Sequence, residues 1–270
     1  MGKKLVHMSL TIGPVFYNST IRLAKKILNN SHAIFVRDQK SYEILTDWKC
    51  KAPYIFNSYD IALLQKIDES KEKKLLYEFG IEPGFIGLSC IYWRFRKAVG
   101  PVKQGGYEKA LAEALDYIIE KYDKQIVVTP TVVTGNGLDD SQIGKRIAGQ
   151  MKHGDKVICI SRLLTPVEMA TLFSKCCFSI VTRMHAAILC SGAGGRPIIA
   201  VNYLYKLREY MKNIGFEDYS VDIDCVYSKN LISFIDKMME NIDSNVSSLH
   251  VRQSNLRKYI SDNLLNNRIW

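Results

Sequence analysis

The residues best suited to chemistry are an arginine and a histidine two positions apart, Arg183 and His185, with Met184 between them. They directly follow the apolar run 178–181 and precede a run of small residues that is typical of a helix. A guanidinium can fork onto a carboxylate or phosphate, and an imidazole can move a proton at neutral pH. The spacing therefore predicts an anion site with an acid–base group beside it. The structural alternative is an arginine paired with a local carboxylate and a histidine that caps backbone groups.

Other candidate residues also follow apolar runs, and they are Trp93, Arg94, Asn202, Tyr203 and Lys206. Lys206 could add a second positive charge to an anion site, whereas the alternative is an exposed helix lysine. Arg94 could reach an acidic ligand, and the indole of Trp93 could stack on a sugar. The alternative for this pair is a hydrophobic lid with solvated charges.

The elements that must position these residues are strands and helices in alternation. Short β-branched runs alternate with stretches of helical length along nearly the whole chain, which predicts an α/β fold with parallel sheets. The predicted strands are 5–12, 33–37, 54–56, 86–91, 126–129, 157–160, 178–181, 197–201 and 219–223. Thr165, Pro166 and Glu168 form the pattern of a capping box at a helix start. Ligands bind outside the carboxyl ends of such strands, where the candidate residues fall.

Glycine and proline residues within 80–84 break regular structure and predict a domain boundary. We expect a partial N-terminal α/β domain over residues 1–80 and a C-terminal doubly wound α/β domain over residues 81–227. The second of these carries the candidate donor site. Residues 228–270 have a helical pattern, and we expect these helices to pack back on the N-terminal domain.

Composition narrows the class of protein. No apolar stretch approaches the roughly 20 residues of a membrane span, so we expect a cytoplasmic protein. The formal charge of +10 favours acidic partners, but the basic residues follow no nucleic-acid-binding motif, so no nucleic acid is expected. The seven cysteines include no CxxC pair, and neither a metal site nor a disulfide framework is expected.

Several motifs resemble those of one known family. The passage 179–187, followed by 195–200 and by Tyr203-x-x-Lys206, resembles the C-terminal signature of the polysaccharide pyruvyl transferase family, in which leucine usually stands where this chain has Met184. Earlier motifs of the family are similar to residues 11–14, 37–41 and 58–60. Relatives carry additional βα units before the first of these motifs, so the comparison implies an incomplete N-terminal domain.

The resemblance implies a glycosyltransferase-B-like pair of Rossmann-type domains. It also implies transfer of a pyruvyl group from phosphoenolpyruvate to two hydroxyls of a hexose, which leaves a cyclic ketal and requires no cofactor beyond the donor substrate. His185 would be the general acid, while Arg183 and Lys206, with Arg94, would bind the donor. Asp60 matches the family by motif position alone. The acceptor would be a sugar on a lipid-linked or polymeric glycan, which would bring a basic protein into peripheral contact with an acidic membrane.

Two other interpretations remain open, because a fold does not fix a function. A nucleotide-sugar glycosyltransferase or epimerase of the same architecture would bind a uridine nucleotide in its cleft. A truncated, non-catalytic remnant that binds a glycan or a partner enzyme would keep a folded second domain without turnover.

Overall fold

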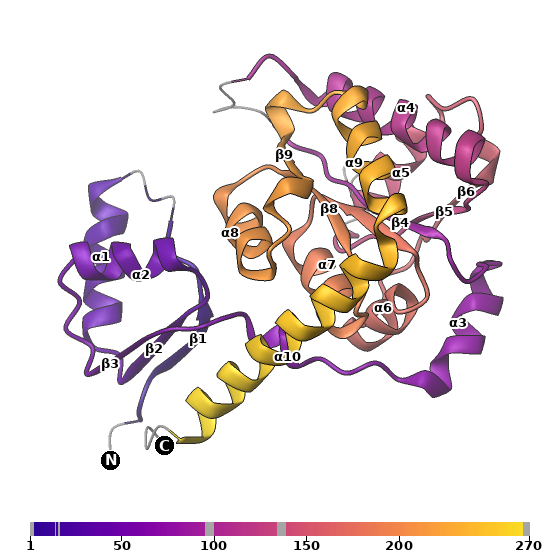
Figure 1. Ribbon diagram of the computed structural model, residues 1–270. Helices are drawn as coiled ribbons and strands as arrows, with labels where there is room; N and C mark the ends of the chain where they lie inside the picture. Colours follow the sequence, from indigo (N-terminus) through magenta and orange to yellow (C-terminus); the bar gives the residue numbers. More distant parts are fainter. Residues whose placement is uncertain (1–2, 14, 16, 95–99, 134–138, 267–270) are drawn as a thin grey trace. The chain divides into compact units, whose positions relative to one another are not determined.

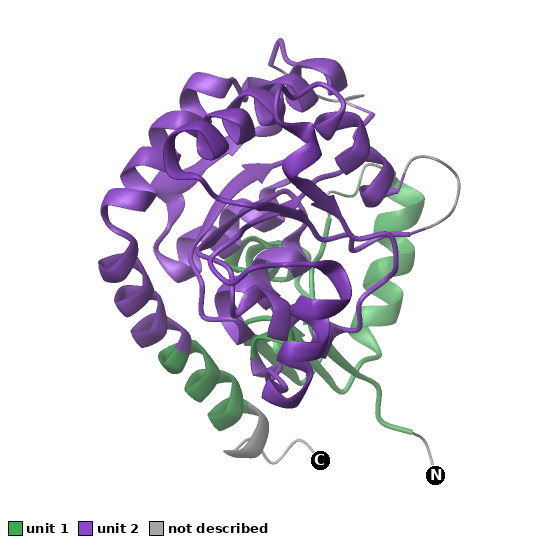
Figure 2. Cartoon of the chain, turned by 90° about the vertical axis from the view of Figure 1, so that its right-hand side faces the viewer, with its two compact units in different colours: residues 1–63, 254–270 green, residues 64–253 purple. Residues whose placement is uncertain are grey.

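The computed structural model describes residues 3–13, 15, 17–94, 100–133 and 139–266 of the 270-residue chain. The chain forms two compact units, one from residues 1–63 together with 254–270 and the other from residues 64–253 (Figure 2). Each unit contains a parallel β-sheet flanked by helices, so the predicted α/β class is confirmed (Figure 1).

The first unit contains a small sheet with strands in the order β1-β2-β3. Its elements are β1 (Val6–Leu10), α1 (Asn18–Asn29), β2 (Ala33–Val36), α2 (Gln39–Asp47), β3 (Tyr54–Asn57) and the 3-10 helix η1 (Ile61–Leu64), which ends at the border of the unit. The central strand β2 is buried throughout, and its side chains alternate between the two faces of the sheet. Ile34 and Val36 pack with Leu45, whereas Phe35 stacks on Phe56 with 4.7 Å between ring centroids.

The second unit contains a six-stranded parallel sheet in the order β6-β5-β4-β7-β8-β9. Its first elements are η2 (Glu69–Lys71), α3 (Glu72–Phe79), β4 (Ile86–Ser89), α4 (Gln104–Tyr122), β5 (Ile126–Val128), α5 (Asp140–Ala148), η3 (Gly154–Lys156) and β6 (Val157–Cys159). They are followed by α6 (Pro166–Phe173), β7 (Phe178–Val181), α7 (Met184–Ile188), the π-helix η4 (Leu189–Ala193), β8 (Ile198–Asn202), α8 (Tyr205–Ile214), η5 (Glu217–Tyr219), β9 (Ser220–Asp222), η6 (Ile223–Cys225) and α9 (Ser228–Glu240). This strand order is that of a doubly wound sheet, and the direction of winding reverses between β4 and β7.

The nine predicted strands are all present, and no bound differs from its prediction by more than two residues. The capping box is also confirmed, since the Thr165 hydroxyl accepts from the Glu168 backbone N–H at 3.2 Å and the Glu168 carboxylate accepts from the Thr165 N–H at 2.8 Å. In the described part of the chain, no helix combines the length and the apolar character that crossing a membrane requires.

The domain boundary differs from the prediction, because residues 64–80 belong to the second unit. The ammonium of Lys175 lies 2.8 Å from a carboxylate oxygen of Glu72 on α3, and the Arg162 guanidinium lies 2.8 Å from Glu78 at the other end of this helix. Gly80 adopts a left-handed conformation with φ of 64° and ends α3. The break at residue 80 therefore marks the end of a helix inside a domain.

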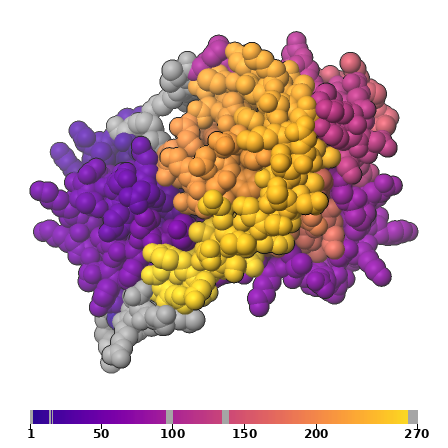
Figure 3. Space-filling model, in the orientation of Figure 1, coloured from indigo at the N-terminus to yellow at the C-terminus, as the bar shows by residue number. Residues whose placement is uncertain are grey.

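The C-terminal helices also differ in part from the prediction. Helix α9 packs along α4 in the second unit, where Asp236 accepts hydrogen bonds from the hydroxyls of Tyr117 and Tyr122 at 2.7–2.9 Å. In the space-filling view, the orange surface of α9 adjoins the magenta surface of α4 (Figure 3). Helix α10 (Ile242–Asn266) enters the first unit only from Ser254 onward. There the hydroxyl of Tyr259 donates to the carbonyl of Asn57 at 2.9 Å. Helix α9 packs in the second unit because one face of it is apolar and buried there. The buried residues of this face are Leu231, Ile235 and Met238.

Candidate functional site

The candidate residues of the second unit gather at the carboxyl edge of its sheet. Trp93 follows β4, Arg183 follows β7, and Tyr203 follows β8. Because these neighbouring strands are parallel, their carboxyl ends meet at one edge. The reversal of winding between β4 and β7 lies at the same edge, which is where doubly wound proteins bind ligands.

Arg183 is held by a carboxylate that sequence reasoning missed. Asp140, the first residue of α5, has a fully buried side chain, and its Oδ1 accepts from Arg183 Nε at 3.2 Å and from a terminal guanidinium nitrogen at 2.7 Å. Its Oδ2 accepts from the backbone and hydroxyl of Thr131 at 2.9 Å and from the backbone of Val132 at 3.0 Å. The carboxylate is thus fixed by its own loop while it holds the arginine.

The ion pair leaves Arg183 able to bind an anion. The bonds to Asp140 use the side edge of the guanidinium, formed by Nε and one terminal nitrogen. The other bidentate edge, formed by the two terminal nitrogens, has the geometry that matches a carboxylate or a phosphate. The arginine side chain is 25% exposed. Arg183 is thus paired with a carboxylate, as the structural alternative expected. The pairing fixes the guanidinium but uses only one of its two bidentate edges.

The loops that carry Arg183 and Trp93 are connected through Tyr107 on α4. The fully buried Tyr107 hydroxyl lies 2.9 Å from Oγ1 of Thr182, the residue before Arg183, and accepts from the backbone of Ile91 at 3.3 Å. Burial raises the pKa of Tyr107 well above its usual value, so the phenol stays neutral and keeps its proton as a donor. Tyr107 therefore fixes the end of β7 relative to the loop after β4.

Gln104, one turn earlier on α4, holds the backbone next to Trp93. Its Oε1 accepts from the Trp93 N–H at 2.9 Å, and its Nε2 donates to the Ile91 carbonyl at 3.1 Å. Nε2 also donates to a carboxylate oxygen of the buried Glu108 at 2.7 Å. The Trp93 ring then meets the Tyr203 ring edge to face, with 4.9 Å between centroids.

The other cationic and acid–base candidates surround this edge. His185 is exposed in the first turn of α7, two residues beyond Arg183. Lys206 is half-buried in the first turn of α8, and Arg94 is exposed after β4. No group of three or more His, Cys, Asp and Glu side chains suited to a metal ion occurs among the described residues.

Asp60 lies in the first unit, within a network that joins the three early motifs. Arg37 donates to Asp60 Oδ2 and to the Thr11 hydroxyl, which itself donates to Asp38 at 3.1 Å. Asp38 also accepts from the backbone of Ser41 at 2.7 Å. Asp60 is buried, and its Oδ1 accepts from the Ala62 backbone at 3.0 Å. These hydrogen bonds give Asp60 a structural role at the carboxyl ends of β2 and β3. Pro14 of the first motif lies outside the described residues.

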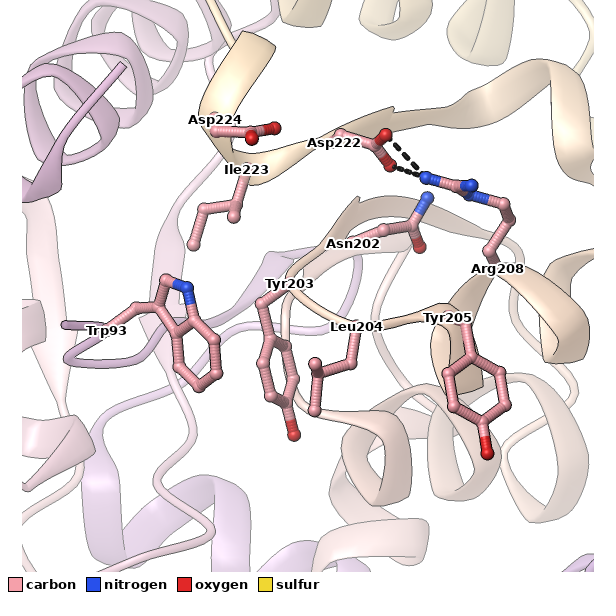
Figure 4. A pocket seen from close by; sticks show the side chains of 9 residues that line it. All are labelled: Trp93, Asn202, Tyr203, Leu204, Tyr205, Arg208, Asp222, Ile223 and Asp224. Atoms are coloured by element: carbon pink, nitrogen blue, oxygen red, sulfur yellow. Dashed lines mark hydrogen bonds and ion pairs between the residues drawn. The ribbon is translucent and has the colours of Figure 1, made fainter. Parts of the chain in front are cut away.

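A pocket of about 180 Å³ opens beside Trp93 and Tyr203 (Figure 4). It is lined by Trp93, Asn202, Tyr203, Leu204, Tyr205, Arg208, Asp222, Ile223 and Asp224. The guanidinium of Arg208 contacts both carboxylate oxygens of Asp222. Asn202 is 4% exposed, and its Oδ1 accepts no hydrogen bond from the described residues. The sequence pointed to Trp93, Asn202 and Tyr203 but not to Arg208, which lies on α8, or to Asp222 and Asp224. The available signal for the two aspartates was their position at the end of β9 and two residues beyond it.

Comparison with known sequences identifies a family. Residues 1–205 match the sequence model described as polysaccharide pyruvyl transferase. A curated relative, the amylovoran biosynthesis protein AmsJ of Erwinia amylovora, is 25% identical over 176 residues. That alignment covers 65% of this chain and 40% of AmsJ, so the chain spans less than half of this relative.

Comparison with solved structures identifies the fold. A putative UDP-N-acetylglucosamine 2-epimerase from Listeria monocytogenes aligns with a TM-score of 0.62 and 13% identity, covering 99% of this chain and 70% of the other. HepE of Anabaena, solved in complex with UDP and glucose, aligns with a TM-score of 0.58 and 16% identity over 97% of this chain and 71% of its own. At these identities the likeness shows the fold alone, and it confirms the predicted glycosyltransferase-B-like class.

Proposed function

Because this chain belongs to the polysaccharide pyruvyl transferase family, we propose that it transfers a pyruvyl group from phosphoenolpyruvate to two hydroxyls of a hexose, forming a pyruvate ketal and releasing phosphate. The observation that carries the proposal is the position of Arg183, just after β7, where the winding of the sheet reverses. One bidentate edge of its guanidinium is paired with Asp140, and the other edge has the geometry that suits an anion. The similarity to a protein of amylovoran biosynthesis favours an acceptor in a cell-surface polysaccharide or its precursor.

Donor binding requires fixed positive charge, since phosphoenolpyruvate carries both a carboxylate and a phosphate. Arg183 supplies a preorganised fork, which needs no rearrangement when the donor arrives. Lys206, in the first turn of α8, and Arg94, after β4, belong to the same edge of the sheet and supply further positive charge. Charge-assisted hydrogen bonds of this kind are about twice as strong as neutral ones.

In the proposed reaction, protonated His185 gives its proton to the methylene carbon of the donor, and the central carbon becomes electrophilic. The first sugar hydroxyl attacks that carbon and returns a proton to the imidazole. The bond from the central carbon to the phosphate oxygen then breaks, and the second hydroxyl closes the ketal while its proton leaves with the phosphate. The exposed position of His185 after β7 supports this role, because the group must meet both substrates.

The test compares two variants of the site with one control. Arg183→Ala should weaken phosphoenolpyruvate binding, since each hydrogen bond to a charged group contributes roughly 1.5–3 kcal/mol. His185→Ala should lower turnover by about 100-fold or more while donor affinity stays within a few-fold. The matched control is His153→Ala, in the same unit, whose side chain is 37% exposed and lies 3.3 Å from Glu120.

Ketal formation is followed by the methyl signal in proton NMR and by phosphate release, donor binding by calorimetry, and folding by thermal unfolding. Normal turnover in a folded His185→Ala protein would refute the mechanism. Binding of a uridine nucleotide without binding of phosphoenolpyruvate would favour a nucleotide-sugar enzyme instead.

The lipid-linked or polymeric nature of the acceptor, and a cytoplasmic location with peripheral contact to an acidic membrane, are part of the same proposal. The net charge of +10 supports it, as does α1, which carries Lys25 and Lys26 beside the exposed side chains of Leu23 and Ile27. Co-sedimentation with phosphatidylserine vesicles, lost in high salt and absent with phosphatidylcholine, is the expected result.

A further inference from the structure

The pocket beside Trp93 and Tyr203 is built by chain segments that are not adjacent in the strand order. Strand β7 lies between β4, which precedes Trp93, and β8, which precedes Tyr203. The contact between the two rings at 4.9 Å therefore bridges the end of β7, where Arg183 begins the next loop. The pocket lies on the β9 side of this bridge, because Asp222, Ile223 and Asp224 form part of its lining (Figure 4).

The charges of the pocket do not suit the donor. Arg208 is neutralised by Asp222, whose two carboxylate oxygens it contacts. Asp224 adds a second carboxylate, and its Oδ2 accepts from the backbone of Gly100 at 2.8 Å. With one guanidinium and two carboxylates, the lining carries a net charge of −1. The net negative charge repels a ligand with two anionic groups, such as phosphoenolpyruvate. A neutral ligand with several hydroxyl groups can instead donate hydrogen bonds to the carboxylates.

The two aromatic rings supply the apolar part of a sugar site. The rings of Trp93 and Tyr203 stand beside each other at one end of the pocket, while Asp222, Asp224 and Asn202 lie toward the other (Figure 4). A pyranose ring has an apolar face of C–H groups and a polar rim of hydroxyls, so it matches a lining divided in this way. The buried Oδ1 of Asn202, which accepts no hydrogen bond from the described residues, needs a donor that such a rim can provide.

Size narrows the ligand further. The pocket volume of about 180 Å³ is smaller than the roughly 300–1,000 Å³ that is usual for drug-sized ligands. A single hexose ring is closer to this size than a nucleoside diphosphate sugar. The volume and the net negative charge thus both disfavour a uridine nucleotide in this pocket.

We propose that this pocket, formed by Trp93, Tyr203, Asn202, Asp222 and Asp224, binds one neutral hexose ring of the acceptor. That the bound sugar is the acceptor rests on the proposed function, whereas sugar binding itself is inferred from the residues that line the pocket. Trp93 and Tyr203 hold the C–H face of the ring, and the polar residues select the pattern of hydroxyls.

The experiment titrates the full chain with methyl glycosides of glucose, galactose and mannose, each as α and β anomers, and follows binding by saturation-transfer NMR and tryptophan fluorescence. At least one glycoside should bind in the millimolar range or tighter. Trp93→Ala should weaken that binding by roughly tenfold, and Trp93→Phe should restore most of it, because a ring face is retained. Asp222→Asn, which keeps the shape of the side chain, should change the preference among the sugars. Trp48→Phe, in the first unit, is the control for tryptophan fluorescence and should leave binding unchanged.

Arg183→Ala separates this proposal from the proposed function. It should weaken phosphoenolpyruvate binding by roughly tenfold or more and leave glycoside binding unchanged. Glycoside binding that depends on Trp93, in a protein that does not bind phosphoenolpyruvate, would retain the sugar site and reject the pyruvyl transferase. The sugar site itself is overturned if no glycoside binds, if binding is equal in a folded Trp93→Ala protein, or if phosphoenolpyruvate displaces the glycoside by direct competition.

Discussion

The pairing of Arg183 with Asp140 gives a prediction whose sign distinguishes positioning from simple electrostatics. Asp140→Asn keeps the shape of the side chain but removes its charge. If the carboxylate served only as a nearby negative charge, its loss would strengthen the binding of the anionic donor. If it orients the guanidinium, its loss should weaken that binding. We expect weaker binding, because Asp140 accepts two bonds from Arg183 and three from Thr131 and Val132.

The magnitude follows from the geometry of an asparagine at this position. Its amide has one acceptor oxygen, so the amide nitrogen must face either the guanidinium or the donors of Thr131 and Val132. In either orientation donors face donors. Removing one partner of a buried ion pair costs about 3–5 kcal/mol. Since Arg183 is 25% exposed and can be solvated, we expect about 3 kcal/mol of lost stability and roughly tenfold weaker donor binding.

The assay measures the phosphoenolpyruvate dissociation constant by calorimetry and the free energy of unfolding by urea denaturation. The matched control is Asp139→Asn, which makes the same charge change one residue earlier. Asp139 caps α5 by accepting from the Gln142 backbone at 3.0 Å, and asparagine is an equally good cap. Unchanged or tighter donor binding in a folded Asp140→Asn protein would refute the positioning role, and so would an equal loss in Asp139→Asn.

Other predictions concern stability. Tyr107→Phe removes the hydroxyl shared by the two site loops and leaves a buried backbone N–H unpaired, so urea unfolding should show a loss of about 1–3 kcal/mol. Gly87→Ala places a Cβ atom 2.3 Å from the Ser179 hydroxyl, and its cost of about 1–3 kcal/mol should be partly relieved by Ser179→Ala in the same chain. Hydrogen bonds from Arg162 lower the pKa of Glu168 from 4.5 to about 2, so Glu168 stabilises the fold above pH 4.5 and this contribution is lost as the pH falls to about 2. Glu168→Gln should therefore flatten the decline of unfolding free energy across that window, and an unchanged slope would contradict the assignment.

The sequence predicted the strands and the residues that follow them, because both depend on local patterns. The apolar run before Arg183 is continuous, as expected of a strand buried on both faces, and the charged group begins where that run ends. The partner of Arg183 could not be predicted in the same way. Asp140 follows β5, and β4 separates β5 from β7 in the sheet. Only the order of the strands brings the arginine to this carboxylate across the end of β4, and local patterning does not contain that order.

The division into units was less predictable for a related reason. A glycine with positive φ can end a helix, as Gly80 ends α3. The glycine does not indicate whether that helix packs in the unit before it or in the unit after it. That choice depends on partners distant in sequence, such as the contact of Glu72 with Lys175. Helix α9 presents the same difficulty. Its apolar stripe predicts that one face is buried, but it does not indicate which other element covers that face.

The ion pair also limits what Arg183 can contribute to the proposed binding of phosphoenolpyruvate. With Asp140 beside it, the pair has no net charge, so its long-range attraction for an anion is small. Its contribution must come at contact range, through a fork already aligned when the donor arrives. Long-range attraction is then left to exposed cations such as Arg94, whose effect is screened by salt. In the proposed site, exposed cations therefore attract the donor, whereas Arg183, held by the buried Asp140, aligns it.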